Sequence, residues 1–172
     1  MINLAKLFQT QKLLDNRIVD EHNLQGQDLL PKKILALQVE LGELANELPE
    51  VFKFWSNKKN NYEKALEEYA DGLHFILSIG NDISLANVSI KNLDGEFKDT
   101  LECFRHCNNW VVNLDYTLHE TACYISTIEK VYKNLISVFL ELGEMLGFTT
   151  DQIEQAYYQK NNINHQRQTD HY

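Results

Sequence analysis

Residues 34–48 read Ile-Leu-Ala-Leu-Gln-Val-Glu-Leu-Gly-Glu-Leu-Ala-Asn-Glu-Leu. Apolar residues recur in this stretch at steps of three and four, which places them on one face of an α-helix: Ile34, Leu37, Leu41, Leu44 and Leu48. Pro31 precedes the pattern at a position where the first helical turn tolerates proline, and Pro49 weakens or ends the helix. We therefore predict an amphipathic helix whose apolar face packs into a helical core.

The same periodicity extends over most of the chain. We predict further helices over residues 2–22, 62–80, about 119–146 and about 151–163. Gly147 is the expected C-cap of the long helix, and Thr150 or Asp151 the expected N-cap of the last one. Residues 84–118 contain Asn-Leu-Asp-Gly and Asn-Asn, so we expect this less regular, variable insertion to hold only short helices. The chain contains only seven Gly and two Pro, which disfavours a turn-rich β fold and predicts an all-α bundle of four or five main helices.

Composition limits the classes of function. A length of 172 residues fits a single domain with a real core. The net charge of −9 argues against a general surface for nucleic acid, so an anionic ligand would need a local basic cluster or a bound cation. Three cysteines in a chain of this size favour reduced thiols, and neither a signal peptide nor a membrane span is apparent, so we expect a cytoplasmic location and no membrane partner.

Two pairs of carboxylates are the sharpest candidates for chemistry. Glu40 and Glu43 are three residues apart in the first acidic helix, and Glu68 and Asp71 are three apart in the next one. Residues at this spacing lie ~60° apart on a helix surface, and both pairs border the apolar face of their helix on the same side. A short connection favours antiparallel packing of the two helices, so all four carboxylates can converge.

Four converging carboxylates repel one another unless a cation lies among them. An oxygen-only set of ligands suits Mg²⁺, with Mn²⁺ as a substitute, and does not suit zinc. Acidic pairs at this spacing are also common on solvated helix faces. The residues alone therefore leave both interpretations open, a metal site and a solvated acidic surface.

The two acidic pairs resemble the metal signature of the all-α NTP pyrophosphatases, the MazG-like superfamily. Three further segments are similar to the dimeric all-α dUTPases within it: residues 11–18 (Gln-Lys-Leu-Leu-Asp-Asn-Arg-Ile), residues 52–55 (Phe-Lys-Phe-Trp) and residues 71–78 (Asp-Gly-Leu-His-Phe-Ile-Leu-Ser). The C-terminus adds Tyr157-x-x-Lys160-Asn161-x-x-Asn164-x-x-Arg167-Gln168-x-x-x-Tyr172, which is similar to the terminal motif of this family. The compact chain resembles the phage and Gram-positive branch.

This resemblance implies a role for each matching residue. Glu40, Glu43, Glu68 and Asp71 would hold Mg²⁺ as the catalytic cluster, and one of the three glutamates would also position the attacking water. Lys160, Arg167 and Tyr172 would bind the phosphates. Gln11, His74 and Asn164 would hydrogen-bond the uracil or the deoxyribose, and Trp55 would pack beside the base. Some relatives carry Asn where Leu14 stands, so that contact to the base is either missing or supplied by another residue such as Asp15.

The implied activity is hydrolysis of dUTP to dUMP and pyrophosphate, which limits uracil in DNA and supplies dUMP. The resemblance also implies a homodimer, with residues 119–146 as a candidate interface. Some phage dUTPases bind bacterial repressor proteins, and residues 84–118 are where such a partner would be sought here. Two alternatives stay open: a related pyrophosphatase acting on another nucleotide, and a non-enzymatic helical interaction protein.

Overall fold

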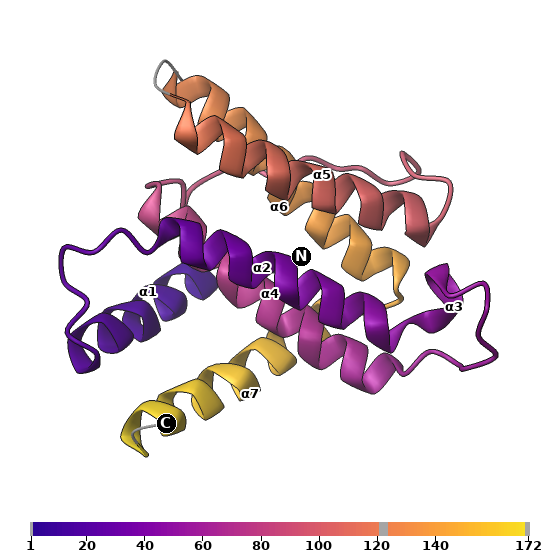
Figure 1. Ribbon diagram of the computed structural model, residues 1–172, viewed down its shortest axis with the longest axis horizontal. Helices are drawn as coiled ribbons and strands as arrows, with labels where there is room; N and C mark the ends of the chain where they lie inside the picture. The colour runs from indigo at the N-terminus through magenta and orange to yellow at the C-terminus, as the bar shows by residue number, and fades with distance from the viewer. Residues whose placement is uncertain (1, 121–123, 171–172) are drawn as a thin grey trace.

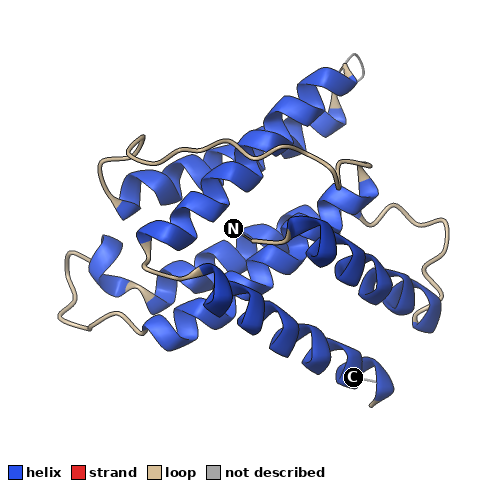
Figure 2. Ribbon diagram, turned by 180° about the vertical axis from the view of Figure 1, so that it is seen from behind, coloured by secondary structure: helices blue, strands red, loops and turns tan. Residues whose placement is uncertain are grey.

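The computed structural model describes residues 2–120 and 124–170, and in this part of the chain it contains seven α-helices and no strand (Figure 2). The helices are α1 (Leu4–Glu21), α2 (Leu30–Glu47), α3 (Pro49–Phe52), α4 (Tyr62–Asp82), α5 (Thr100–His119), α6 (Ile125–Met145) and α7 (Thr150–Thr169). The prediction of an all-α fold is confirmed. Six of these helices are long, and the short α3 begins at Pro49, the residue expected to end the preceding helix.

The helices form three layers around α4 (Figure 1). The antiparallel pair α2 and α4 makes the most extensive contact and lies in the middle layer. The pair α5 and α6 covers one side of it, and α1 and α7 pack on the other side, mainly against α4. Because α4 contacts helices on both sides, most of its side chains from Tyr69 to Gly80 are buried, and the functional residues it carries have fixed surroundings.

Two glycines allow α4 and α6 to pack closely. Tyr132 on α6 lies against Gly80, and its hydroxyl donates a hydrogen bond to the carbonyl of Ile76 at 2.9 Å. In the reverse direction, Tyr69 on α4 lies against Gly143 and donates to the carbonyl of Phe139 at 3.0 Å. A Cβ at Gly80 would overlap the Tyr132 ring, so this position requires the smallest residue.

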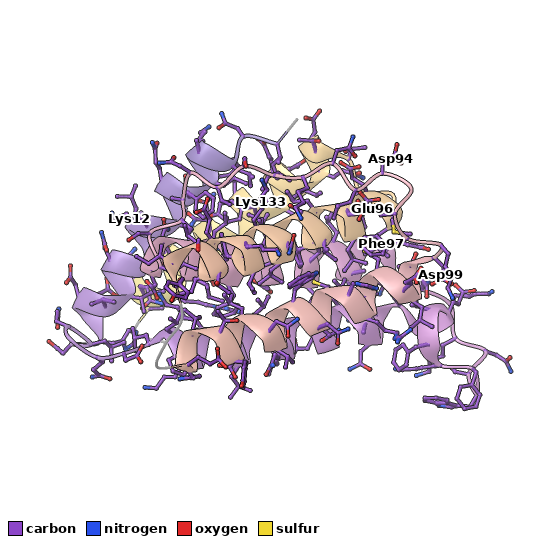
Figure 3. All side chains as sticks on the ribbon, turned by 90° about the horizontal axis from the view of Figure 1, so that it is seen from above. Lys12, Asp94, Glu96, Phe97, Asp99 and Lys133 are labelled. Carbon is purple, nitrogen blue, oxygen red and sulfur yellow. The ribbon has the colours of Figure 1, made fainter. Side chains whose placement is uncertain are left out.

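The connection between α4 and α5 runs along α6. Its backbone is fixed at Lys91, whose N–H donates to Ser137 Oγ at 3.0 Å and whose Nζ donates to Asn134 Oδ1 at 2.5 Å. Figure 3 shows that Asp94, Glu96, Phe97 and Asp99 gather at one end of the molecule, where this connection leads into α5. Asp99 caps α5 by accepting a hydrogen bond from the N–H of Glu102 at 2.8 Å.

The expectation of only short helices in residues 84–118 is wrong, because α5 runs without interruption from Thr100 to His119. Its buried stripe of Cys103, Cys107, Val111 and Leu114 has helical spacing, and the Asn108-Asn109 pair lies on the exposed face, where it costs little. The expected start of the long helix at residue 119 is also wrong, since that residue ends α5 and α6 begins at Ile125.

Two smaller expectations need correction. The N-cap of α7 is Thr149 instead of Thr150 or Asp151, and it forms a capping box with Gln152. α7 continues to Thr169 instead of ending near residue 163. Its second half is polar and has no apolar periodicity, and hydrogen bonds from α1 hold it in place.

Gly147 has a φ of +80° just after α6, as expected for a residue that ends a helix. No helix in the described ranges is sufficiently long and apolar to cross a membrane.

Candidate active site

The carboxylates of α2 and α4 meet because the two helices run in opposite directions. Lys33 pairs with Asp82 at one end of the helix pair, and the backbone of Asn61 bonds to that of Glu47 at the other. Between these ends, Glu40 lies opposite Glu68 and Asp71, and each of the three offers a carboxylate oxygen within 4.8 Å of the others. The predicted convergence therefore holds for these three acids.

Glu43 stands beside this cluster. Its side chain is exposed and does not belong to the group within 4.8 Å, but its charge raises the pKa values of Glu40, Glu68 and Asp71. Glu47 lies one helical turn further along α2 and contributes to the raised pKa of Glu68. Both residues are close enough to interact electrostatically with a ligand of the cluster.

The cluster is electrostatically strained without a cation. Partial burial and repulsion from Asp71, Glu43 and Glu68 raise the pKa of Glu40 to about 7. Burial also raises the pKa values of Glu68 and Asp71, and it outweighs the opposing effect of Lys160. A group of oxygen ligands that repel one another at neutral pH fits a hard divalent cation.

α7 brings positive charge to the cluster. Nζ of Lys160 lies 2.5 Å from Oδ2 of Asp71, and Arg167 is close enough to lower the pKa of that carboxyl. Arg167 also donates from Nη1 to Asn164 Oδ1 at 3.3 Å. Lys160, Asn164 and Arg167 thus share one face of α7, and this face supplies the local basic cluster that the acidic composition requires.

A cavity of about 420 Å³ adjoins the cluster. Its polar lining includes six residues predicted for substrate binding (Gln11, Asp15, His74, Lys160, Asn164 and Arg167) together with Glu40 and Asp71 of the cluster. Its apolar lining comes from Leu14, Ile18, Val19, Leu29, Ala36 and Phe75. The cavity therefore combines an apolar part, lined from α1, α2 and α4, with a charged part, lined by the carboxylate cluster and by α7.

A buried hydrogen-bond network fixes Gln11 at the apolar part. Its Oε1 accepts a hydrogen bond from Tyr157 Oη at 2.9 Å and lies 2.6 Å from His74 Nδ1. The His74 ring stacks on that of Tyr157 with centroids 4.1 Å apart, and burial lowers the pKa of His74 to about 4, so the ring is neutral at physiological pH. Tyr157 stands in the C-terminal motif, but the sequence assigned it no role.

Asp15 is held by two donors. Gln11 Nε2 donates to Oδ1 and Ser78 Oγ donates to Oδ2, each at 2.9 Å. Burial raises the pKa of Asp15, and Lys33 with the two hydrogen bonds partly offsets this. Ser78 was missed from the sequence, although its position four residues after His74 and seven after Asp71 puts it on the same face of α4.

One predicted substrate residue among those described, Trp55, does not line this cavity. Trp55 lies in the connection after α3, 67% exposed, with its ring against those of Phe52 and Phe54. This connection is at the end of α2 opposite the cavity lining of Leu29 and Lys32 (Figure 1). Tyr172, predicted to bind phosphate, lies outside the described residues.

Comparison with known protein families gives one match. The model of a family described as dUTPase matches residues 3–172, which includes every helix and both parts of the cavity. A search of curated proteins finds no match.

Proposed function

The chain belongs to the all-α dUTPase family and is a dUTP diphosphatase, and we propose that its activity depends on Mg²⁺ held by Glu40, Glu43, Glu68 and Asp71. The observation that supports this proposal is the cluster of three carboxylates within 4.8 Å at the charged end of the cavity. Carboxylate oxygens without histidine or cysteine suit Mg²⁺, and Mn²⁺ can substitute. A bound divalent cation would neutralise phosphate charge and make water more acidic.

The side chains of this chain supply the remaining chemistry. Lys160 and Arg167 bind phosphate oxygens and place the phosphoanhydride beside the cluster, where in-line positioning lowers the barrier. A carboxylate oxygen of Glu40, Glu43 or Glu68 positions the water and accepts its proton. The products are dUMP and pyrophosphate.

The apolar part of the cavity accommodates the base. Gln11 and Asp15 offer polar groups there, and Leu14, Ile18 and Phe75 provide apolar contact. His74 holds Gln11 in place, and Asn164 adds an amide from α7. Trp55 would contact the base only after a rearrangement or from a second copy, and Tyr172 would act on the phosphates from beyond the described residues.

We also propose a homodimer, a cytoplasmic location and a repressor partner for residues 84–118. Exposed apolar side chains on α5 and at the start of α6 favour a covered surface there: Leu101, Val112, Tyr116, Tyr124 and Ile125. Multi-angle light scattering would give a mass of two chains for a dimer, whereas the mass of one chain would contradict it.

The proposed function is tested by pyrophosphate release from dUTP, dCTP, dTTP and UTP, each with Mg²⁺, with Mn²⁺ and with EDTA. We expect turnover of dUTP that stops in EDTA and returns with added Mg²⁺. Undiminished turnover in EDTA would contradict the metal site. Faster turnover of another nucleotide would indicate a related pyrophosphatase, and no turnover at all would indicate a helical interaction protein.

A further inference from the structure

We propose that Asp15 distinguishes dUTP from dCTP by accepting a hydrogen bond from N3–H of uracil, and that Ser78 and Gln11 are the positioning residues that hold its carboxylate. This inference rests on the proposed function, because it concerns the base of the nucleotide in the same cavity. It assigns the discrimination between uracil and cytosine to a residue that can still accept a hydrogen bond from a ligand.

Gln11 Oε1 and His74 have little capacity left for a ligand. A carbonyl oxygen has two lone pairs, and those of Gln11 Oε1 already face Tyr157 Oη at 2.9 Å and His74 Nδ1 at 2.6 Å. In the neutral ring Nδ1–H donates to Gln11 Oε1, and the carbonyl oxygen of Tyr157 lies 3.2 Å from Nε2, where it occupies the approach of a ligand. These atoms stabilise the wall of the cavity and are poorly placed to read a base as well.

Asp15 differs from them in this respect. Each carboxylate oxygen has two lone pairs, and the hydrogen bonds from Gln11 Nε2 and Ser78 Oγ use one on each oxygen. Asp15 lines the cavity, so a remaining lone pair can accept a hydrogen bond from a base. The Gln11 amide has a second N–H, which places a donor beside this acceptor.

This pattern matches uracil and opposes cytosine. Uracil presents N3–H as a donor beside the acceptor O4, whereas cytosine presents N3 as an acceptor beside an amino donor. A cytosine in this cavity would direct its N3 lone pair at the carboxylate and its amino group at the Gln11 amide. Because Leu14, Ile18 and Phe75 keep this part apolar, such mismatched groups would stay without a partner.

Ser78 and Gln11 make this selection possible by fixing the carboxylate from both sides. A carboxylate that could rotate would present either oxygen, and a protonated one could donate to cytosine N3. The hydrogen bonds from Ser78 and Gln11 oppose the effect of burial, which raises the pKa of Asp15. The measurements should therefore be made near pH 8, because a higher pH favours the ionised form of a carboxyl group whose pKa is raised.

The test compares kcat/KM for dUTP and dCTP in the wild type and in Asp15→Asn. An asparagine keeps the shape, loses the charge and offers an N–H to cytosine N3. We expect the ratio of kcat/KM for dUTP to that for dCTP to fall by about 100-fold or more. Asp20→Asn, which removes an exposed carboxylate from the same helix, should leave the ratio unchanged.

Ser78→Ala tests the positioning role through a double-mutant cycle. Alone it should lower the dUTP-to-dCTP ratio, but by a smaller factor than Asp15→Asn. In the Asp15→Asn background it should have no further effect on the ratio. A purely structural role of Ser78 would instead lower turnover of both nucleotides alike in both backgrounds.

The outcomes separate this inference from the proposed function. If the wild type hydrolyses dUTP selectively and Asp15→Asn lowers kcat/KM for both nucleotides by the same factor, the assignment of Asp15 is overturned and the dUTPase activity stands. If the wild type hydrolyses neither nucleotide, the proposed function itself fails. Thermal unfolding of each variant shows whether a loss of turnover reflects a loss of fold, and an unfolded Asp15→Asn is replaced by Asp15→Ser, for which the same fall in the ratio is expected.

Discussion

Nζ of Lys160 lies 2.5 Å from Oδ2 of Asp71, so the last helix carries a cation directly to the carboxylate cluster of α2 and α4. This contact joins residues that are far apart in the sequence. It orients the polar face of α7 toward the cavity and partly compensates the repulsion among the acids.

Replacing Lys160 should weaken substrate binding. In Lys160→Met we expect kcat/KM for dUTP to fall by about 10- to 100-fold, mainly through KM, because a charge-assisted contact to phosphate is lost. Steady-state kinetics at saturating Mg²⁺ measure this change. Lys12→Met is the control, since Lys12 is exposed on α1 and does not line the cavity, and an unchanged KM in Lys160→Met would contradict the assignment.

The raised pKa of Glu40 predicts a pH-dependent stability difference. The pKa is about 7 in the folded protein and ordinarily 4.5, so the folded state holds the proton more tightly, and the resulting stability is lost as pH rises from about 4.5 through 7. Glu40→Gln has no proton to lose. In EDTA, its free energy of unfolding should therefore rise relative to wild type by about 1 kcal/mol between pH 5 and pH 8, a value discounted for solvent around this half-buried side chain.

The lowered pKa of His74 makes the folded state more stable as pH rises, which is opposite to the effect of Glu40. Wild type and Glu40→Gln both contain His74, so its contribution cancels in the difference between their free energies of unfolding. Denaturant unfolding at the two pH values gives the result. A difference in the free energy of unfolding that stays constant between pH 5 and pH 8 would contradict the electrostatic description of the cluster. Equal stabilisation of Glu40→Gln and wild type by Mg²⁺ at pH 8 would also contradict it.

Two glycine substitutions are expected to have opposite effects on stability, because Gly80 lies where α4 packs against α6 and Gly42 lies on the open side of α2. Gly80→Ala forces a Cβ into the Tyr132 ring and should lower the free energy of unfolding by about 1–3 kcal/mol. Gly42→Ala adds a Cβ in open space on a helix and should raise it by about 0.5–1 kcal/mol. Urea unfolding measures both, and a Gly80→Ala protein as stable as wild type would refute the close approach.

Arg17 is expected to stabilise the second half of α7. Its Nη1 donates to the carbonyl of His165 at 2.9 Å and its Nη2 to Thr169 Oγ1 at 3.0 Å. Beyond Asn161, no described residue of α7 is buried, so these polar contacts hold the segment that carries Asn164 and Arg167. Arg17→Ala should speed amide hydrogen exchange in residues 162–169 and raise KM several-fold.

The control for this prediction is Arg105→Ala, which removes an exposed arginine from α5. Exchange in residues 162–169 should match wild type there. Equal protection of this segment in Arg17→Ala and wild type would mean that other contacts hold the helix.

The sequence predicted the helices whose buried faces are continuous. α2 and α4 follow from leucine spacing, and the positions of Glu40, Glu68 and Asp71 beside that face predicted their convergence. α5 was missed because an exposed Asn-Asn pair was interpreted as a break, although Cys103, Cys107 and Val111 form a helical stripe. Its burial depends on α6, which local sequence does not reveal.

The part of the site that could not be predicted consists of contacts between distant side chains. Tyr157 donates to Gln11, and Ser78 to Asp15, across 146 and 63 positions of sequence. Each pair depends on how α1, α4 and α7 pack, and spacing within one helix does not determine that. The position of Trp55 away from the cavity could not be predicted either, because it depends on the direction in which the chain leaves α3.

The central claim is that the carboxylate cluster holds the metal ion on which dUTP hydrolysis depends. The most direct test is to measure pyrophosphate release by Asp71→Asn and Glu68→Gln across a Mg²⁺ titration. Glu67→Gln is the matched control, because Glu67 neighbours Glu68 on α4 but is exposed and lies outside the cluster. We predict a loss of at least about 100-fold in kcat for the two cluster variants, with a higher Mg²⁺ requirement, and wild-type behaviour for Glu67→Gln. Wild-type turnover and Mg²⁺ dependence in Asp71→Asn and Glu68→Gln would contradict the claim.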